Sequence, residues 1–313
     1  MAFKRVPQKF NASINEVVIG TGEKAVTLGG ASVLPLYSFD GDIPNKIAVG
    51  AEITDHGYDA SVPGIAEYYA GCEGLGAIAK RASEMPGADF VVLTLEGADP
   101  NGENKSVEDC VAAAKEVCDA IDVPLAIQGC KNIEKDTELF SKIAEALSGK
   151  NVLFVSAREE DYKAICASAV MAYGQKISAE SAVDINLAKQ LNVLISQMGI
   201  QPASYVMNVG SAAAGYGYEY VASTLDRVKS AALAQNDDKL QMPIITPVSD
   251  EAWSVKEAVV SEEEFPEWGS REERGVEMEV STAASVIAGG SDAVILRHPR
   301  SVDTISRLVR ELM

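Results

Sequence analysis

The sequence predicts an α/β fold, a (β/α)₈ TIM barrel with an N-terminal hairpin extension and a long loop after strand 7. Short apolar runs alternate eight times with helical patterns along the chain. The runs are apolar on both faces, as in a parallel sheet covered by helices. The 313 residues also exceed the roughly 250 that such a barrel needs.

The apolar, β-rich runs predict eight strands. In chain order these are residues 47–53, 90–95, 124–128, 152–156, 176–179, 204–209, 243–247 and 293–297. A doubly wound open sheet is the alternative arrangement of such strands. It usually carries a glycine-rich dinucleotide motif after its first strand, and residues 50–57 contain none. We therefore favour the barrel.

A helical pattern follows each predicted strand. The predicted helices are residues 64–82, 106–121, 136–148, 159–174, 182–199, 218–235, 275–290 and 302–313. Ser106 precedes Asp109 by three residues, a variant capping box that places the start of the second helix.

Two segments lie outside the eight strand–helix units. Residues 1–45 hold two short strand-like runs around Thr21-Gly22-Glu23-Lys24, which predict a hairpin over the bottom of the barrel. We therefore divide the chain into a lead-in and hairpin, 1–45, and the barrel, 46–313, as a single domain overall.

The second segment is "DEAWSVKEAVVSEEEFPEWGSREERG", residues 250–275. It is long for a loop between a strand and its helix, carries both tryptophans, Trp253 and Trp268, and has an acidic excess. Loops in this position lie on the functional face of a barrel. The segment predicts a lid or a protein-contact element. The alternative is an insertion packed on its own barrel.

Composition excludes several classes of partner. The formal net charge of −19 argues against nucleic acid and anionic membrane, which need a basic surface. We find neither a signal-peptide pattern nor an apolar stretch near the roughly 20 residues that span a bilayer, and expect a cytoplasmic protein. No two of the five cysteines have Cys-x-x-Cys spacing, so we expect no iron–sulfur cluster on this chain.

Polar residues gather where the strands end, the functional face of a barrel. They are Glu52, Asp55, His56, Glu96, Asp99, Asn101, Gln128, Cys130, Arg158, Glu180, Asp184, Asn208, Ser211, Thr246, Arg297 and His298. Two of them have structural alternatives. Glu52 could pair with Arg158 or Arg297, and Asp55 could form a turn with Gly57.

The strand ends hold no complete catalytic set. The chain has only two histidines, too few for a typical barrel metal site, and no Gly-x-Ser-x-Gly follows a strand. The corrinoid signature Asp-x-His-x-x-Gly is absent too, because Asp55 and His56 are adjacent. We assign no catalytic residue and no protein-held metal.

Two longer stretches carry a family resemblance. They are residues 28–55, with Gly29-Gly30, Leu34-Pro35, Phe39, Gly41 and Ile43-Pro44-Asn45, and residues 215–246, with Gly215-Tyr216-Gly217, Glu219-Tyr220 and Gln241-Met242-Pro243-Ile244-Ile245. With these, the chain resembles the small (delta) subunit of the corrinoid/iron–sulfur protein of the anaerobic acetyl-CoA (Wood–Ljungdahl) pathway.

The resemblance implies a methyl carrier. Such a barrel forms a heterodimer with a large subunit that carries a four-iron–four-sulfur cluster and a corrinoid domain, and the two subunits enclose a cobamide. The complex accepts a methyl group from methyltetrahydrofolate through a separate methyltransferase and passes it to acetyl-CoA synthase. The small subunit then shields the cofactor without catalysing a reaction itself.

The resemblance also implies that loops after the first, second and sixth strands face the corrin. The residues we expect there are Asp55, His56, Asn101, Asn208, Gly210, Ser211 and Tyr216. A stand-alone pterin-binding methyltransferase is the alternative, with Asp55, Asp99 and Asn208 as candidate pterin contacts. Strands three and four, however, end in Gln128-Gly129-Cys130 and Ser156-Ala157 rather than in an Asp- and Asn-rich set.

Overall fold

Eight parallel strands form a nearly closed barrel in the computed structural model, which describes residues 6–313. The strands are β3 (Ala48–Thr54), β4 (Phe90–Thr94), β5 (Leu125–Gln128), β6 (Leu153–Ala157), β7 (Lys176–Glu180), β8 (Tyr205–Asn208), β9 (Ile245–Pro247) and β10 (Ala293–Leu296). Their order is β8-β7-β6-β5-β4-β3-β10-β9, and a parallel bridge between Met207 and Ile244 brings the two edges together. All eight predicted strands are confirmed, with ends that differ by at most two residues.

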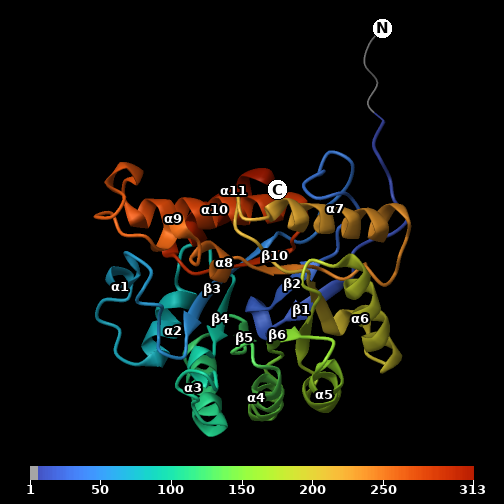
Figure 1. Cartoon of the computed structure of the whole chain (residues 1–313). Helices are drawn as coiled ribbons and strands as arrows, with labels where there is room; N and C mark the ends of the chain where they lie inside the picture. The colour runs from blue at the N-terminus through green and yellow to red at the C-terminus, as the bar shows by residue number, and fades with distance from the viewer. Residues whose placement is uncertain (1–5) are drawn as a thin grey trace.

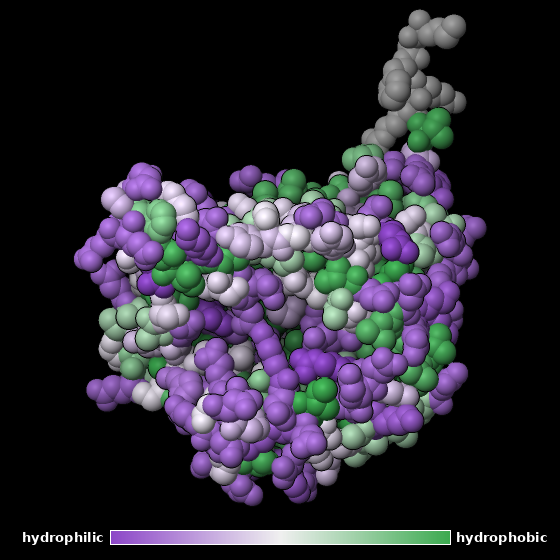
Figure 2. Space-filling view, viewed as in Figure 1, coloured by the Kyte–Doolittle hydropathy of each residue, from purple (hydrophilic) through white to green (hydrophobic). Residues whose placement is uncertain are grey.

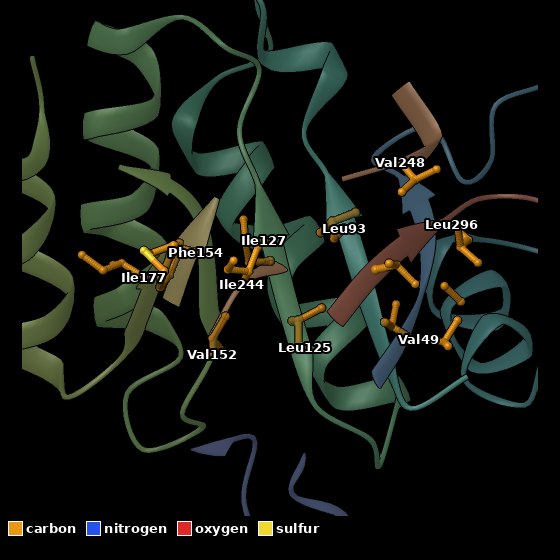
Figure 3. Packing of buried hydrophobic residues seen from close by; sticks show 14 of the residues in the cluster. Val49, Leu93, Leu125, Ile127, Val152, Phe154, Ile177, Ile244, Val248 and Leu296 are labelled. Carbon is orange, nitrogen blue, oxygen red and sulfur yellow. The ribbon is translucent and has the colours of Figure 1, made fainter. Parts of the chain in front are cut away.

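Helices surround the strands (Figure 1). They are α1 (Ile65–Tyr68), α2 (Leu75–Ser83), α3 (Val107–Ala120), α4 (Ile133–Ala146), α5 (Tyr162–Ile165), α6 (Ile185–Gln197), α7 (Tyr218–Ala234), α10 (Arg271–Gly289) and α11 (Pro299–Leu312). The Ser106 side chain accepts a hydrogen bond from the backbone N–H of Asp109, which confirms the predicted cap of α3. Outward-facing strand residues such as Leu93, Ile127 and Phe154 pack under these helices (Figure 3).

Two predicted helices differ from the structure. The helix expected over 64–82 is wrong as one element, because Gly71 and Gly74 both have φ of +83° and end the right-handed helix between α1 and α2. The helix expected over 159–174 begins as α5 and continues as a π-helical turn, Cys166–Met171.

The barrel interior is apolar at the strand starts and polar at the strand ends. Strand side chains alternate between two faces, and those facing inward include Phe90, Val92 and Ala126 in the lower layers. Further along β4 and β5 the inward positions become Thr94 and Gln128. Apolar side chains therefore fill the barrel at the strand starts, and polar side chains line it at the strand ends.

The predicted hairpin is confirmed and covers the apolar end. Strands β1 (Glu16–Ile19) and β2 (Val26–Gly29) pair antiparallel, and Val17, Ile19 and Leu28 join the inner core. The Asn151 side chain, just before β6, donates to the backbone oxygens of Val18 (2.8 Å) and Gly20 (2.9 Å). Within the lead-in segment, residues 1–5 lie outside the described part of the chain.

The long segment after β9 is folded onto its own barrel. It contains α8 (Ser249–Ala252), α9 (Lys256–Val259) and a 3₁₀ turn (Pro266–Trp268). Trp253 is only 7% exposed, and its ring lies so close to Gly275 that a Cβ there would be 2.1 Å away. The Trp253 ring fills the junction with α10, which agrees with the alternative of an insertion packed on its own barrel.

The remaining aromatics of this segment form a small cluster of their own. Phe265 and Trp268 stack with ring centroids 4.5 Å apart, and the Lys256 ammonium lies 4.4 Å from the Phe265 centroid. Both rings are half-buried, so the segment is a structured rim of the open end.

Within residues 6–313 the structure has no helix long and apolar enough to cross a membrane.

The tight barrel interior gives a stability prediction. A Cβ on Gly50 of β3 would lie 2.4 Å from the Phe90 ring, whereas a Cβ on Gly102 would meet nothing closer than 3.6 Å. We expect Gly50→Ala to lower the free energy of unfolding by about 1–3 kcal/mol through overpacking. Urea denaturation measures the effect, with Gly102→Ala as the matched control. Equal stability of the two variants would contradict the packing described for the inner core.

Candidate functional site

The polar end of the barrel opens into a cavity of about 300 Å³. It is lined by Gln128, Gly129, Lys131, Asp136, Val155, Ser156, Arg158, Glu180, Ala182, Val183, Asn208, Gly210, Ser211, Pro247, Asp250 and Glu251. A smaller cavity of about 200 Å³ adjoins it and shares Gly129, Lys131 and Asp250 with it. We call the larger one the mouth cavity. Hydrophilic side chains gather around the middle of the face shown in Figure 2.

One buried arginine organises one side of this end. Arg297, which follows β10 and is 5% exposed, donates from Nε to Glu52 (3.0 Å) and from its terminal nitrogens to Asp59 (2.5 Å) and Asp250 (3.0 Å). A fourth carboxylate, that of Glu96, lies 3.8 Å away. The predicted pairing of Glu52 is therefore with Arg297, while Arg158 pairs with Glu180 (3.3 Å).

Burial and charge oppose each other around Arg297. Burial alone would lower the pKa of its guanidinium, but Glu52, Asp250 and Asp59 raise it above its ordinary value. Burial also raises the pKa of Glu96, and Arg297 opposes that rise. The cation therefore remains charged and allows several carboxylates to share a partly dry site.

A second polar network joins the ends of β6, β7 and β8. The Ser156 hydroxyl accepts hydrogen bonds from Ser178 (3.0 Å) and from the Asn208 amide (2.9 Å). The other end of that amide, Asn208 Oδ1, accepts from the backbone N–H of Gly210 (3.0 Å). Asp161 accepts a hydrogen bond from the backbone N–H of Arg158 (2.6 Å), and burial raises the pKa of its carboxyl group to about 6. The network fixes Asn208 with its side chain at the wall of the mouth cavity.

Three residues expected to face a cofactor line this cavity together. Asn208, Gly210 and Ser211 all come from the end of β8 and the loop after it. Gly210 has φ of +86°, and a Cβ there would lie 2.9 Å from the Val183 side chain. Glycine therefore permits the loop to turn close against the loop after β7.

Asp55 and His56 lie elsewhere on the rim. The backbone N–H of Gly57 donates to the oxygen of Thr54 (2.9 Å), so the expected turn is present. The Asp55 carboxylate is buried, accepts from the Gly97 N–H (3.0 Å) and pairs with Lys105 (3.0 Å). It therefore ties the loop after β3 to the loop after β4. His56 is more exposed, and its Nδ1 lies 3.2 Å from Lys105 Nζ.

Asn101 and Tyr216 are surface residues of this end. Asn101 bonds to Asp99 Oδ1 through its backbone N–H (2.9 Å) and its side chain (3.2 Å). Tyr216 is 49% exposed, and its hydroxyl donates to Glu257 on α9 (2.6 Å), which raises the pKa of the phenol. Tyr216 thus links the loop after β8 to the segment after β9. The structure gathers the predicted residues at one end of the barrel but brings only three of them into one cavity.

Several cavity residues were not among the cofactor contacts expected from the sequence. They are Gln128, Lys131, Asp136, Arg158, Asp250 and Glu251. Asp136 carried a usable signal, because it shares with Leu139, Phe140 and Ile143 the buried stripe of α4. A carboxylate in such a stripe needs a partner, and Asp136 accepts from the backbone N–H (2.8 Å) and thiol (3.3 Å) of Cys130. No comparable sequence pattern marks Lys131 or Asp250 as a residue of the cavity.

The metal-binding potential of this end is low. Across residues 6–313, no group of three or more His, Cys, Asp or Glu side chains is placed to hold a metal ion. Burial raises the pKa of Cys110 to about 11 and that of Cys130 to about 11, so both remain thiols at neutral pH. The geometry supports hydrogen bonding to a polar ligand.

Comparisons with known proteins agree with one another. The family model described as CO dehydrogenase/acetyl-CoA synthase delta subunit matches residues 16–305. Subunit delta 2 of the acetyl-CoA decarbonylase/synthase complex of Methanosarcina acetivorans is 31% identical, over 98% of this chain and 74% of the relative. The delta subunit of Methanothermobacter thermautotrophicus is also 31% identical, over 97% and 76%.

Solved structures agree on the fold. The 7,8-dihydropteroate synthase of Vibrio fischeri gives a TM-score of 0.56 at 10% identity, covering 89% of this chain and 98% of that one. The dihydropteroate synthase of Thermus thermophilus gives 0.54 at 13% identity, covering 95% and 100%. At these identities the likeness extends to the barrel architecture alone.

The buried position of Arg297 gives a second stability prediction. We expect Arg297→Met to lower the free energy of unfolding at neutral pH by about 3–5 kcal/mol, because it leaves buried carboxylates without their cation. Arg300→Met is the control, since Arg300 is exposed and water screens its pairs with Glu272 and Glu273. Urea denaturation at pH 7 compares the two. A loss at Arg297 no larger than that at Arg300 would contradict a structural role for the buried arginine.

Proposed function

The chain belongs to the CO dehydrogenase/acetyl-CoA synthase delta subunit family, and on that premise we propose that it is the small subunit of a corrinoid/iron–sulfur methyl carrier. The observation that carries the proposal is the family match over nearly the whole barrel, and the polar open end of the barrel agrees with it. With its large subunit, the chain encloses a cobamide that receives a methyl group and passes it on.

The open end suits the edge of a corrin better than the whole ring. A cavity of about 300 Å³ is at the lower limit of small-ligand sites and would admit only a side arm of the macrocycle. A corrin carries amide arms around its edge, which need both donors and acceptors. At the mouth cavity, Arg158 supplies donors, and Gln128 Oε1 and Ser211 Oγ supply acceptors that have no partner within residues 6–313. The residues present therefore fit the group.

Each expected contact has a defined place in this proposal. Asn208, Gly210 and Ser211 would hold the cobamide edge, and Tyr216 would lie at the rim beside it. His56 and Asn101 would approach from the loops after β3 and β4, while Asp55 would act through the loop that it ties down. The cobalt of the bound cobamide would supply the centre that accepts and donates the methyl group. The barrel end itself would exclude water and oxidants from that centre.

We assign the four-iron–four-sulfur cluster to the large subunit alone. Iron–sulfur clusters need several cysteine thiolates together, whereas across residues 6–313 no three His, Cys, Asp or Glu side chains are placed to hold a metal ion. The same scheme gives the chain its partners. They are the large subunit in a heterodimer, a methyltetrahydrofolate methyltransferase and acetyl-CoA synthase. The hairpin of 1–45 and the barrel of 46–313 act in it as one domain.

A stand-alone pterin-binding methyltransferase is less well supported. Of its candidate contacts, Asp55 is buried and already engaged by Gly97 and Lys105. Asp99 bonds to Asn101 and lines the adjoining cavity rather than the mouth cavity beside Asn208. The three candidates therefore do not converge on one ligand.

Purification with and without a large subunit tests the proposal. We expect the isolated chain to be colourless, with far less than one iron or cobalt per chain. Co-expressed with a large subunit of the family, it should form a heterodimer with one cobalt and about four irons. Metal analysis and size-exclusion chromatography measure both states.

Two results would contradict the proposal. One is about four irons, or one tightly bound cobalt, in the isolated chain. The other is methyl transfer from methyltetrahydrofolate to free cobalamin by the isolated chain, which would favour the stand-alone enzyme.

A further inference from the structure

Gln128 at the end of β5 presents a hydrogen-bonding problem. The side chain is 6% exposed, and its Nε2 donates to Asp250 Oδ2 at 3.0 Å. Because an ionised carboxylate only accepts hydrogen bonds, this contact fixes which end of the amide faces Asp250. Gln128 Oε1 therefore faces away from it, buried and without a partner among residues 6–313. A buried carbonyl oxygen in that state is costly, so the site favours a donor from elsewhere.

A second unpartnered oxygen belongs to the same cavity. Ser211 Oγ is buried and has no hydrogen-bond partner within the described chain, and Ser211 and Gln128 both line the mouth cavity. The neighbouring Ser156, Ser178 and Asn208 are hydrogen-bonded to one another. Arg158 adds donors to the same wall, since its Nε is paired with Glu180 and its guanidinium carries further N–H groups.

The charges around the cavity narrow the choice of ligand. Two basic side chains, Lys131 and Arg158, line it together with four acidic ones. An anion would therefore meet an excess of negative charge. A cation would compete with existing ion pairs. Asp250 is already paired with both Arg297 and Lys131. Glu180 is already paired with Arg158. A neutral group that both donates and accepts avoids both costs.

We propose that the mouth cavity is a subsite for a neutral primary carboxamide, with Gln128 Oε1 and Ser211 Oγ accepting from its NH₂ group and Arg158 donating to its oxygen. This rests on the proposed function, which supplies the ligand, one peripheral amide arm of the shared cobamide. Both oxygens are closed to solvent in the structure, inside the cavity as well as outside it, so binding requires the Gln128 and Ser211 side chains to shift toward the arm. The subsite fixes the rotation of the corrin relative to the barrel.

Two corrinoids that differ only in these arms test the subsite. Dicyanocobinamide carries amide arms, and dicyanocobyrinic acid carries carboxylates in their place. Titrating each into the cofactor-free heterodimer and following the visible spectrum gives both dissociation constants. We expect the wild-type complex to prefer the amide form, since carboxylate arms meet the acidic cavity wall.

Gln128→Leu should weaken binding of dicyanocobinamide about three- to tenfold, the usual effect of one lost buried hydrogen bond, and reduce the preference over the acid. Ser211→Ala lies on a loop and should act in the same direction, which gives an independent reading if Gln128→Leu folds poorly. Gln201→Leu is the matched control, because Gln201 is exposed just before β8, at the opposite end of the barrel. It should leave both constants unchanged.

The outcomes separate the two levels of proposal. If the wild-type complex binds neither corrinoid, the proposed function fails. If it binds both, and Gln128→Leu and Ser211→Ala retain wild-type affinity and preference, the carrier role stands and the subsite is overturned. Equal weakening for both corrinoids would also overturn it, since that pattern indicates a structural change without amide recognition.

Discussion

The open end of this barrel depends on one buried cation. Arg297 holds Glu52 from β3, Asp59 from the loop after β3 and Asp250 from the segment after β9 in direct contact. Carboxylates this poorly hydrated would otherwise repel one another or take up protons. With the guanidinium between them, the three carboxylates are held close together. The loops that carry them therefore keep fixed positions around the mouth cavity, which a preorganised binding face requires.

The two ends of the barrel differ in role: the apolar end stabilises the fold, and the polar end contains the cavity. The strand starts and the hairpin bury Val17, Ile19 and Phe90 in one apolar core, which closes that end. The strand ends carry Gln128 and Ser211, each with a buried side-chain oxygen that has no partner within residues 6–313. Unsatisfied groups are tolerated where a ligand completes them. The arrangement agrees with a subunit that forms one wall of a cofactor site and leaves the cofactor's other contacts to a partner.

The strands and the hairpin could be predicted because their signal is local. Runs such as residues 90–95 combine β-branched and apolar residues between turn signals, and the barrel retains that preference. The break between α1 and α2 is also local, because Gly71 and Gly74 adopt positive φ within an otherwise helical pattern. The burial of Trp253 was not predictable in this way, because it depends on Gly275 of a later helix. Asp55 likewise turns to Gly97 and Lys105, contacts that no spacing reveals. The family resemblance indicated the face, and only the structure located the cavity.

Hydrogen–deuterium exchange tests most directly the claim that this polar end faces a shared cobamide. The chain would be compared alone and in the heterodimer, with and without the cofactor. The account predicts cofactor-dependent protection in residues 54–57, 99–101 and 208–216, and unchanged exchange in the hairpin, residues 16–29, at the opposite end. Cofactor-dependent protection at the hairpin, with the three loops unchanged, would contradict it.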